Sequence, residues 1–138
     1  MAKAPQTILV IDDDPAFAFF IGSLIHRGEY RSVVATAGGE GLRLARTLLP
    51  ALILCDLSMP GLGGVEVFRI LRDDPVTTHI PRVLMSGHGC PDLRVVPADA
   101  FISKPMDTQA LWRLVRAFTR RPHPVANPAS STAAASDS

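Results

Sequence analysis

The sequence is poor in features that several classes of protein require. Only two of the 138 residues are cysteine, and because Cys55 and Cys90 lack framework spacing we expect reduced thiols in a cytoplasmic protein. The formal net charge is +1, which gives no reason to expect nucleic-acid binding. No apolar run reaches the roughly 18 residues that would cross a membrane, and the first residues lack a signal-peptide pattern.

What is present is an ordinary globular composition, with 47% hydrophobic and 20% charged residues. The length allows one domain with a substantial core and little more. We therefore predict one domain over residues 1–121. Residues 122–138 are rich in Pro, Ala and Ser with almost no large apolar side chains, and this composition predicts a disordered tail.

Short apolar runs alternate with segments of helical period, which predicts βα units and a parallel sheet. The expected strands are 7–11, 32–35, 51–55, 82–85 and 100–103. Their apolar character is nearly continuous, as expected when helices cover both faces of a sheet. Helices are predicted from Pro15 onwards, over 40–49, over 64–72, and from an Asp107 cap onwards. Residues 86–99 contain several Gly and Pro, so the fourth helix of the alternation should be shortened or irregular.

The first predicted helix has both a cap and an apolar stripe. Asp14 is a suitable N-cap and Pro15 suits the first helical position. The spacing i, i+3, i+4, i+7, i+8 then predicts a buried face made of Phe17, Phe20, Ile21, Leu24 and Ile25.

Polar side chains follow the apolar runs at the points where the strands should end. Asp12 and Asp13 follow the first run, Asp56 the third, Ser86 the fourth and Lys104 the fifth. In a flavodoxin-like, doubly wound sheet of order 2-1-3-4-5, the first and third strands are neighbours, and ligands bind beyond their carboxyl ends. We predict this fold, with all five side chains at one edge of the sheet.

Three carboxylates at one edge raise one another's pKa unless a cation relieves the repulsion. Mg²⁺ prefers oxygen ligands, usually one or two carboxylates plus phosphate and water. Lys104 supplies further positive charge, and a unit-charge pair at about 4 Å is worth on the order of 4 kcal/mol at an effective dielectric near 20. The pattern therefore predicts a divalent metal site around one reactive aspartate.

Four motifs in order carry a resemblance to a known family. They are Ile-Leu-Val-Ile-Asp12-Asp13-Asp14-Pro, Leu-Ile-Leu-Cys-Asp56-Leu-Ser-Met-Pro-Gly, Arg-Val-Leu-Met-Ser86-Gly and Phe101-Ile-Ser-Lys104-Pro105. The sequence resembles the receiver domain of bacterial two-component response regulators, in particular stand-alone, chemotaxis-type receivers. The resemblance implies that Asp56 accepts a phosphoryl group, that Asp12, Asp13, Asp56 and the Ser58 backbone carbonyl hold Mg²⁺, that Ser86 and Lys104 bind the phosphoryl oxygens, and that Ser86 and Phe101 form the switch.

The same resemblance implies partners and a limited chemistry. The phosphoryl donor would be a sensor histidine kinase or a phosphotransfer protein, and an unknown downstream protein would receive the signal by docking or phosphorelay. We expect a monomer or weak dimer without conventional enzyme activity, apart from Mg²⁺-dependent self-phosphorylation and autodephosphorylation. The family also has a cis peptide at Lys104-Pro105. The stretch from Ser86 to Lys104 is shorter than is usual in the family, which puts signal readout through the family's usual output surface in doubt.

Other interpretations stay open at this point. The chain could be a pseudo-receiver that is never phosphorylated, although its acidic, Ser and Lys positions are complete. A flavin-binding carrier would need a phosphate cradle where this chain has carboxylates, and a dehalogenase-type phosphatase would carry its nucleophile after the first strand. Phe101 could be an ordinary core aromatic, and His88 lacks a partner at metal-ligand spacing.

Overall fold

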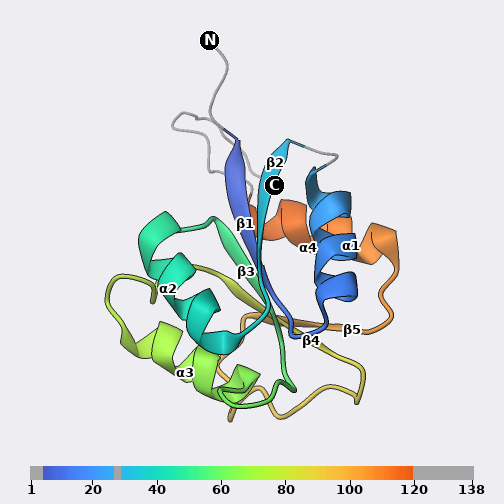
Figure 1. Cartoon of the computed structure of the whole chain (residues 1–138). Coiled ribbons are helices and arrows are strands. Elements are labelled where there is room, and N and C mark those ends of the chain that lie inside the picture. The colour runs from blue at the N-terminus through green and yellow to red at the C-terminus, as the bar shows by residue number, and fades with distance from the viewer. Residues whose placement is uncertain (1–4, 27–28, 120–138) are drawn as a thin grey trace, which may run out of the picture.

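The computed structural model describes residues 5–26 and 29–119, which form a parallel sheet with helices on both faces (Figure 1). The strand order is β2-β1-β3-β4-β5, which confirms the predicted flavodoxin-like, doubly wound topology. In chain order the elements are β1 (Gln6–Ile11), α1 (Pro15–His26), β2 (Tyr30–Ala35), α2 (Gly38–Leu48), β3 (Leu52–Asp56), α3 (Gly64–Asp73), β4 (Arg82–Ser86), β5 (Ala100–Ser103) and α4 (Thr108–Thr119). The predicted tail lies outside the described residues.

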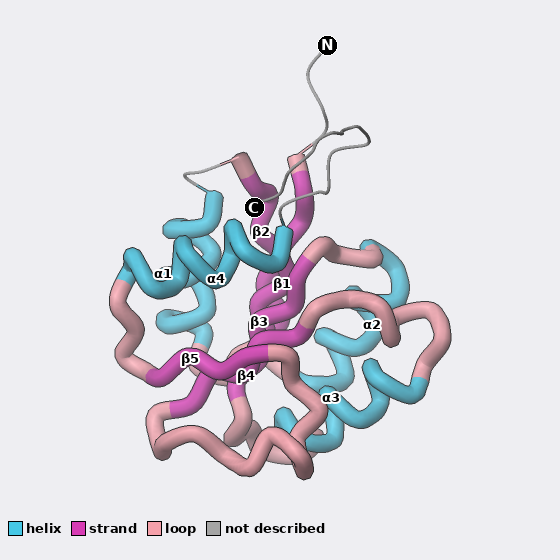
Figure 2. The backbone as a smooth tube through the Cα atoms, turned by 180° about the vertical axis from the view of Figure 1, so that it is seen from behind, coloured by secondary structure: helices cyan, strands magenta, loops and turns pink. Residues whose placement is uncertain are grey.

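Two apolar cores lie on opposite faces of the sheet, and each is closed by a pair of helices. Helices α1 and α4 cover one face and α2 and α3 the other (Figures 1 and 2). Strand β1 contributes Ile8 and Val10 to the first core and Leu9 and Ile11 to the second. Because successive side chains of a strand point to opposite faces, burial on both faces explains the continuous apolar runs. No helix among the described residues is long and apolar enough to pass through a bilayer.

Helix α1 begins as predicted, and its buried face overlaps the predicted one, because Ile21 and Ile25 are buried and Phe17 and Leu24 pack against the same core. Asp14 Oδ1 accepts the backbone N–H groups of Ala16 and Phe17, at 3.1 and 3.4 Å, so the predicted N-cap is confirmed. The prediction that Phe20 is buried is wrong, because 53% of this residue is exposed. The buried residues are Ala18, Ile21, Gly22 and Ile25. A Cβ on Gly22 would lie 3.2 Å from Val34 Cγ2 of β2, so small residues bring this face close to the sheet.

Several element ends differ from the predicted ones by one or two residues. Strand β2 starts at Tyr30 because Tyr30 and Arg31 continue the parallel register with Gln6 and Thr7 of β1. The Tyr30 hydroxyl also lies 2.8 Å from Thr119 Oγ1 at the end of α4. These partners are distant in sequence, and local patterning does not mark them.

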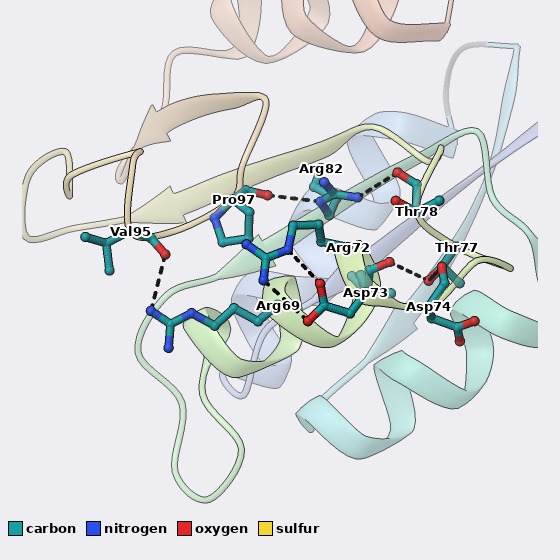
Figure 3. A network of polar contacts seen from close by, with 10 residues as sticks. Arg69, Arg72, Asp73, Asp74, Thr77, Thr78, Arg82, Val95 and Pro97 are labelled. Carbon is teal, nitrogen blue, oxygen red and sulfur yellow. Dashed lines mark hydrogen bonds and ion pairs between the residues drawn. The ribbon is translucent and has the colours of Figure 1, made fainter.

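The connection from β4 to β5 is irregular, with only a short turn at residues 93–95, which confirms the prediction of a shortened or irregular helix between these strands. Buried Arg82 holds this connection in place (Figure 3). Its guanidinium donates to the carbonyls of Pro97 at 3.0 Å and Thr78 at 3.1 Å, and its backbone N–H donates to Asp99 Oδ2 at 2.8 Å. Arg69, on α3, also donates to the carbonyl of Val95. Arginine–carbonyl hydrogen bonds thus anchor this segment in place of helix packing.

Candidate functional site

The predicted site residues lie at the carboxyl-end edge of the sheet, and backbone hydrogen bonds fix their positions. The N–H of Asp12 donates to the carbonyl of Ala35 at 3.0 Å, which ties the end of β1 to β2. The N–H of Lys104 donates to the carbonyl of Ser86 at 2.8 Å, which ties the end of β5 to β4. Asp56 closes β3 and pairs in register with Met85 of β4. The sheet therefore presents these side chains from adjoining strand ends.

Three carboxylates meet at this edge. Asp12, Asp13 and Asp56 each offer an oxygen within 4.8 Å of the others. Asp12 is fully buried and Asp56 is 6% exposed, whereas Asp13 is open to solvent. Oxygen donors at this spacing suit a hard divalent cation, and the exposed Asp13 leaves a route for it from solvent.

Lys104 joins two of the carboxylates. Its Nζ lies 2.7 Å from Asp12 Oδ2 and 3.0 Å from Asp56 Oδ1. The other oxygen of Asp12 accepts the backbone N–H of Asp14 at 2.9 Å. The buried Asp12 carboxylate is therefore paired on both oxygens, as a buried charge requires. With all four groups ionised, one ammonium leaves two of the three negative charges uncompensated, which is the charge of a divalent cation.

The environment shifts the pKa of both Asp56 and Lys104 upward. Burial raises the pKa of Asp56, and the nearby charges of Asp12 and Asp13 raise it further, while Lys104 opposes the shift. For Lys104, burial lowers the pKa, but hydrogen bonds and charge from Asp12 and Asp56 outweigh it and the net shift is upward. The charged form of Lys104 is therefore favoured, whereas burial and the neighbouring carboxylates disfavour the ionised form of Asp56.

An aromatic ring lies against the same ammonium. The ring of Phe17, in the first turn of α1, has its centroid 4.3 Å from Lys104 Nζ. Its position in an apolar stripe predicted a core residue, and it does pack against the core beneath α1. The contact with Lys104 has no signal in the sequence, because the first turn of α1 and the residue that follows β5 meet only in the folded chain.

The remaining predicted residues lie around the cluster. Ser86 is 1% exposed, and its Oγ accepts the backbone N–H of His88 at 3.0 Å. Phe101 is half-buried against the core beneath α2 and α3. Ser58 is exposed in the loop after β3, and His88 is exposed after β4. The Lys104-Pro105 peptide is cis, as the resemblance implied. The phosphoryl, metal and switch roles of these residues stay predictions.

A glycine that sequence reasoning passed over packs directly against the end of β3. A Cβ on Gly64, the first residue of α3, would collide with the carbonyl oxygen of Asp56 and approach Leu57 Cα within 2.7 Å. The Gly64 N–H also donates to the carbonyl of Leu57 at 2.9 Å. Helix α3 therefore supports the backbone that carries Asp56.

Comparison with known proteins agrees with this architecture. The response regulator receiver domain family matches residues 8–116. The response regulator PleD of Caulobacter vibrioides is 37% identical over 118 residues, which cover 82% of this chain and 26% of PleD. A response regulator signal receiver domain from Bermanella marisrubri has a TM-score of 0.74 and 32% identity, covering 83% of this chain and 98% of that one.

A further structural neighbour resembles the chain in fold. The receiver domain of the sensor histidine kinase PA1611 from Pseudomonas aeruginosa, solved with a magnesium ion coordinated in its active site cleft, has a TM-score of 0.78 and 22% identity over 84% of this chain and 98% of that one. The curated relatives are longer proteins, of which the chain spans from about a quarter to about a half. With its matched family, strand order and acidic edge, the chain belongs to the response regulator receiver domain family.

Proposed function

We propose that the chain accepts a phosphoryl group on Asp56 from a histidine kinase or phosphotransfer protein. The observation that carries this proposal is the position of Lys104 Nζ, which contacts both Asp12 and Asp56 beside a third carboxylate. In the transfer, an Asp56 carboxylate oxygen attacks phosphorus, the new O–P bond forms as the P–N bond of the phosphohistidine breaks, and the imidazole leaves and is protonated. Such chemistry depends mainly on positioning and charge neutralisation.

Asp12, Asp13, Asp56 and the Ser58 carbonyl are the proposed ligands of Mg²⁺. The carboxylate spacing and the two uncompensated charges support this assignment, and the PA1611 receiver domain holds magnesium in its active site cleft. When bound, Mg²⁺ supplies charge neutralisation for the incoming phosphoryl group. The end of β3 positions the acceptor oxygen of Asp56, and the ion pair with Asp12 keeps the Lys104 ammonium beside that oxygen.

Lys104 and Ser86 are the proposed ligands of the phosphoryl oxygens. The modification replaces one negative charge on Asp56 with about two, so Lys104 gains a stronger partner. Ser86 is buried at the end of β4, and its hydroxyl accepts a loop N–H. We propose that the hydroxyl turns to the phosphoryl group and that Phe101, the second residue of the neighbouring strand β5, repacks into the vacated space. This is a population shift between two packings, and it would transmit the signal to a downstream protein.

The alternative is a pseudo-receiver that binds a partner without being phosphorylated. The two are separated by incubating the protein with acetyl phosphate and Mg²⁺ and measuring acyl phosphate by intact mass and hydroxylamine sensitivity. We expect one phosphoryl group in the wild type and none in Asp56→Asn or in the presence of a chelator. A folded wild-type protein that stays unmodified with both acetyl phosphate and a panel of histidine kinases would favour the pseudo-receiver.

A further inference from the structure

The Lys104 ammonium contacts two carboxylates and one uncharged ring among the described residues. Its Nζ lies 2.7 Å from Asp12 Oδ2, 3.0 Å from Asp56 Oδ1 and 4.3 Å from the centroid of the Phe17 ring. An ammonium has three N–H donors, so the partners match the donors in number. A cation over an aromatic face within about 6 Å is attracted by the ring quadrupole, and more strongly where water is excluded.

We propose that Phe17 is a positioning residue for phosphoryl acceptance, whose ring holds the Lys104 ammonium beside Asp56 throughout the reaction. This inference rests on the proposed function. A bound cation and an incoming phosphoryl group both change how Asp12 and Asp56 interact with the Lys104 ammonium, whose N–H groups they accept or face. The ring takes no part in those exchanges, so its attraction for the ammonium persists in the free, metal-bound and phosphorylated states.

Both partners of this contact are anchored at their backbones. Phe17 lies in the first turn of α1, where its N–H donates to the Asp14 cap, and its ring packs against the core beneath α1. The backbone of Lys104 is tied to Ser86 by a hydrogen bond of 2.8 Å. The side chain of Lys104 is 20% exposed, so its long stem could turn the ammonium away from the site toward solvent. The ring limits that freedom.

The substitution Phe17→Leu keeps an apolar side chain and removes the aromatic face, whereas Phe17→Tyr restores the face. We expect Phe17→Leu to weaken fluoroberyllate binding about three- to tenfold in saturating Mg²⁺. The Tyr variant should bind within about twofold of the wild type, because the ring is retained. Mg²⁺ affinity should not weaken in either variant, since neither substitution changes a proposed Mg²⁺ ligand. Damage to the site as a whole would instead weaken the binding of both Mg²⁺ and fluoroberyllate.

Calorimetric titration of the full chain with Mg²⁺, and then with fluoroberyllate in excess Mg²⁺, measures both affinities. The matched control is Phe20→Leu, which changes an exposed phenylalanine on the same helix and should leave both affinities unchanged. NMR of the metal-free protein provides a second readout, because the Phe17 ring current should change the chemical shifts of the ε-methylene protons of Lys104. This ring-current shift should be absent in Phe17→Leu and present in Phe17→Tyr.

The outcomes separate the inference from the function on which it rests. A Phe17→Leu variant that binds fluoroberyllate as tightly as the wild type would overturn the positioning role while phosphoryl acceptance stands. Lys104 proton shifts that do not respond to Phe17→Leu, or equal losses of Mg²⁺ and fluoroberyllate affinity without rescue by Tyr, would overturn it too. A wild-type protein that binds Mg²⁺ but no fluoroberyllate refutes the proposed function, and the positioning role with it.

Discussion

Replacing Lys104 by methionine should destabilise the metal-free protein by about 2–3 kcal/mol, and Mg²⁺ should restore most of that loss. The substitution keeps the apolar stem and removes the charge that lies between Asp12 and Asp56. Asp12 is fully buried, so the variant leaves a carboxylate inside the protein without its counter-ion. A bound divalent cation supplies positive charge to the same carboxylates.

The magnitude follows from the geometry. At the observed separations of 2.7 and 3.0 Å, each attraction is worth roughly 6 kcal/mol at an effective dielectric near 20. Most of this is offset by the desolvation of the charges, and removing one partner of a buried pair costs about 3–5 kcal/mol. The side chain of Lys104 is 20% exposed, so solvent screening reduces the expected loss to about 2–3 kcal/mol. For a domain of this size that is a fall in Tm of roughly 10 °C.

The assay is thermal unfolding followed by circular dichroism, with a chelator and again with a Mg²⁺ titration. The control is Arg94→Met, which removes an exposed arginine from its ion pair with Asp92 and should leave Tm unchanged in both buffers. Mg²⁺ should raise the Tm of Lys104→Met more than that of the wild type. The reasoning is refuted if Lys104→Met melts within about 2 °C of the wild type in chelator, or if Mg²⁺ stabilises both proteins equally.

Three further predictions concern Asp56, Arg82 and Gly64. Burial raises the pKa of Asp56, so the stabilising contribution of its protonated form is present below the unfolded pKa of about 3.9 and is lost as pH rises through the folded pKa; in chelator, Asp56→Asn should therefore melt higher than the wild type at pH 7 but not at pH 3.5. Arg82→Met should destabilise the protein by about 2–4 kcal/mol, because it removes charged donors from part-buried carbonyls, and should speed amide exchange over residues 87–99; unchanged exchange there would contradict the anchoring role. Gly64→Ala should cost about 1–3 kcal/mol and slow modification by acetyl phosphate, since the new Cβ meets the Asp56 carbonyl; Gly39→Ala, at the second residue of α2 and with no atom within 4 Å of the new Cβ, should instead stabilise the chain in unfolding titrations by about 0.5–1 kcal/mol.

The strands and the acidic edge were predictable from the sequence because each depends on a short local pattern. A run that is apolar at every position, such as residues 8–11, predicts a strand buried on both faces, and both cores of the structure use it. The polar residue after each run then falls at the carboxyl end of its strand. Asp14 and Pro15 likewise marked the start of α1, because capping depends only on neighbouring residues.

Local patterns failed where distant segments decide the outcome. The apolar stripe of α1 predicted a buried Phe20, but the buried face is rotated toward Ala18 and Gly22, which are small enough to let this part of the helix approach the sheet closely. Arg82 was expected only to begin a strand, yet its side chain holds the connection between β4 and β5, because the carbonyls that accept its hydrogen bonds converge only in the folded chain.

By itself, then, the sequence determined the kinds of group that gather at one edge: carboxylates, a hydroxyl and a lysine, each delivered by a strand end. Only the tertiary structure decided which of them touch. Lys104 and Asp12 are 92 positions apart along the chain, and their contact depends on how β1, β3 and β5 are ordered and twisted in one sheet. The same holds for Phe17. Its spacing along the helix predicted that it packs against the core, whereas its contact with Lys104 depends on how α1 packs in the folded chain.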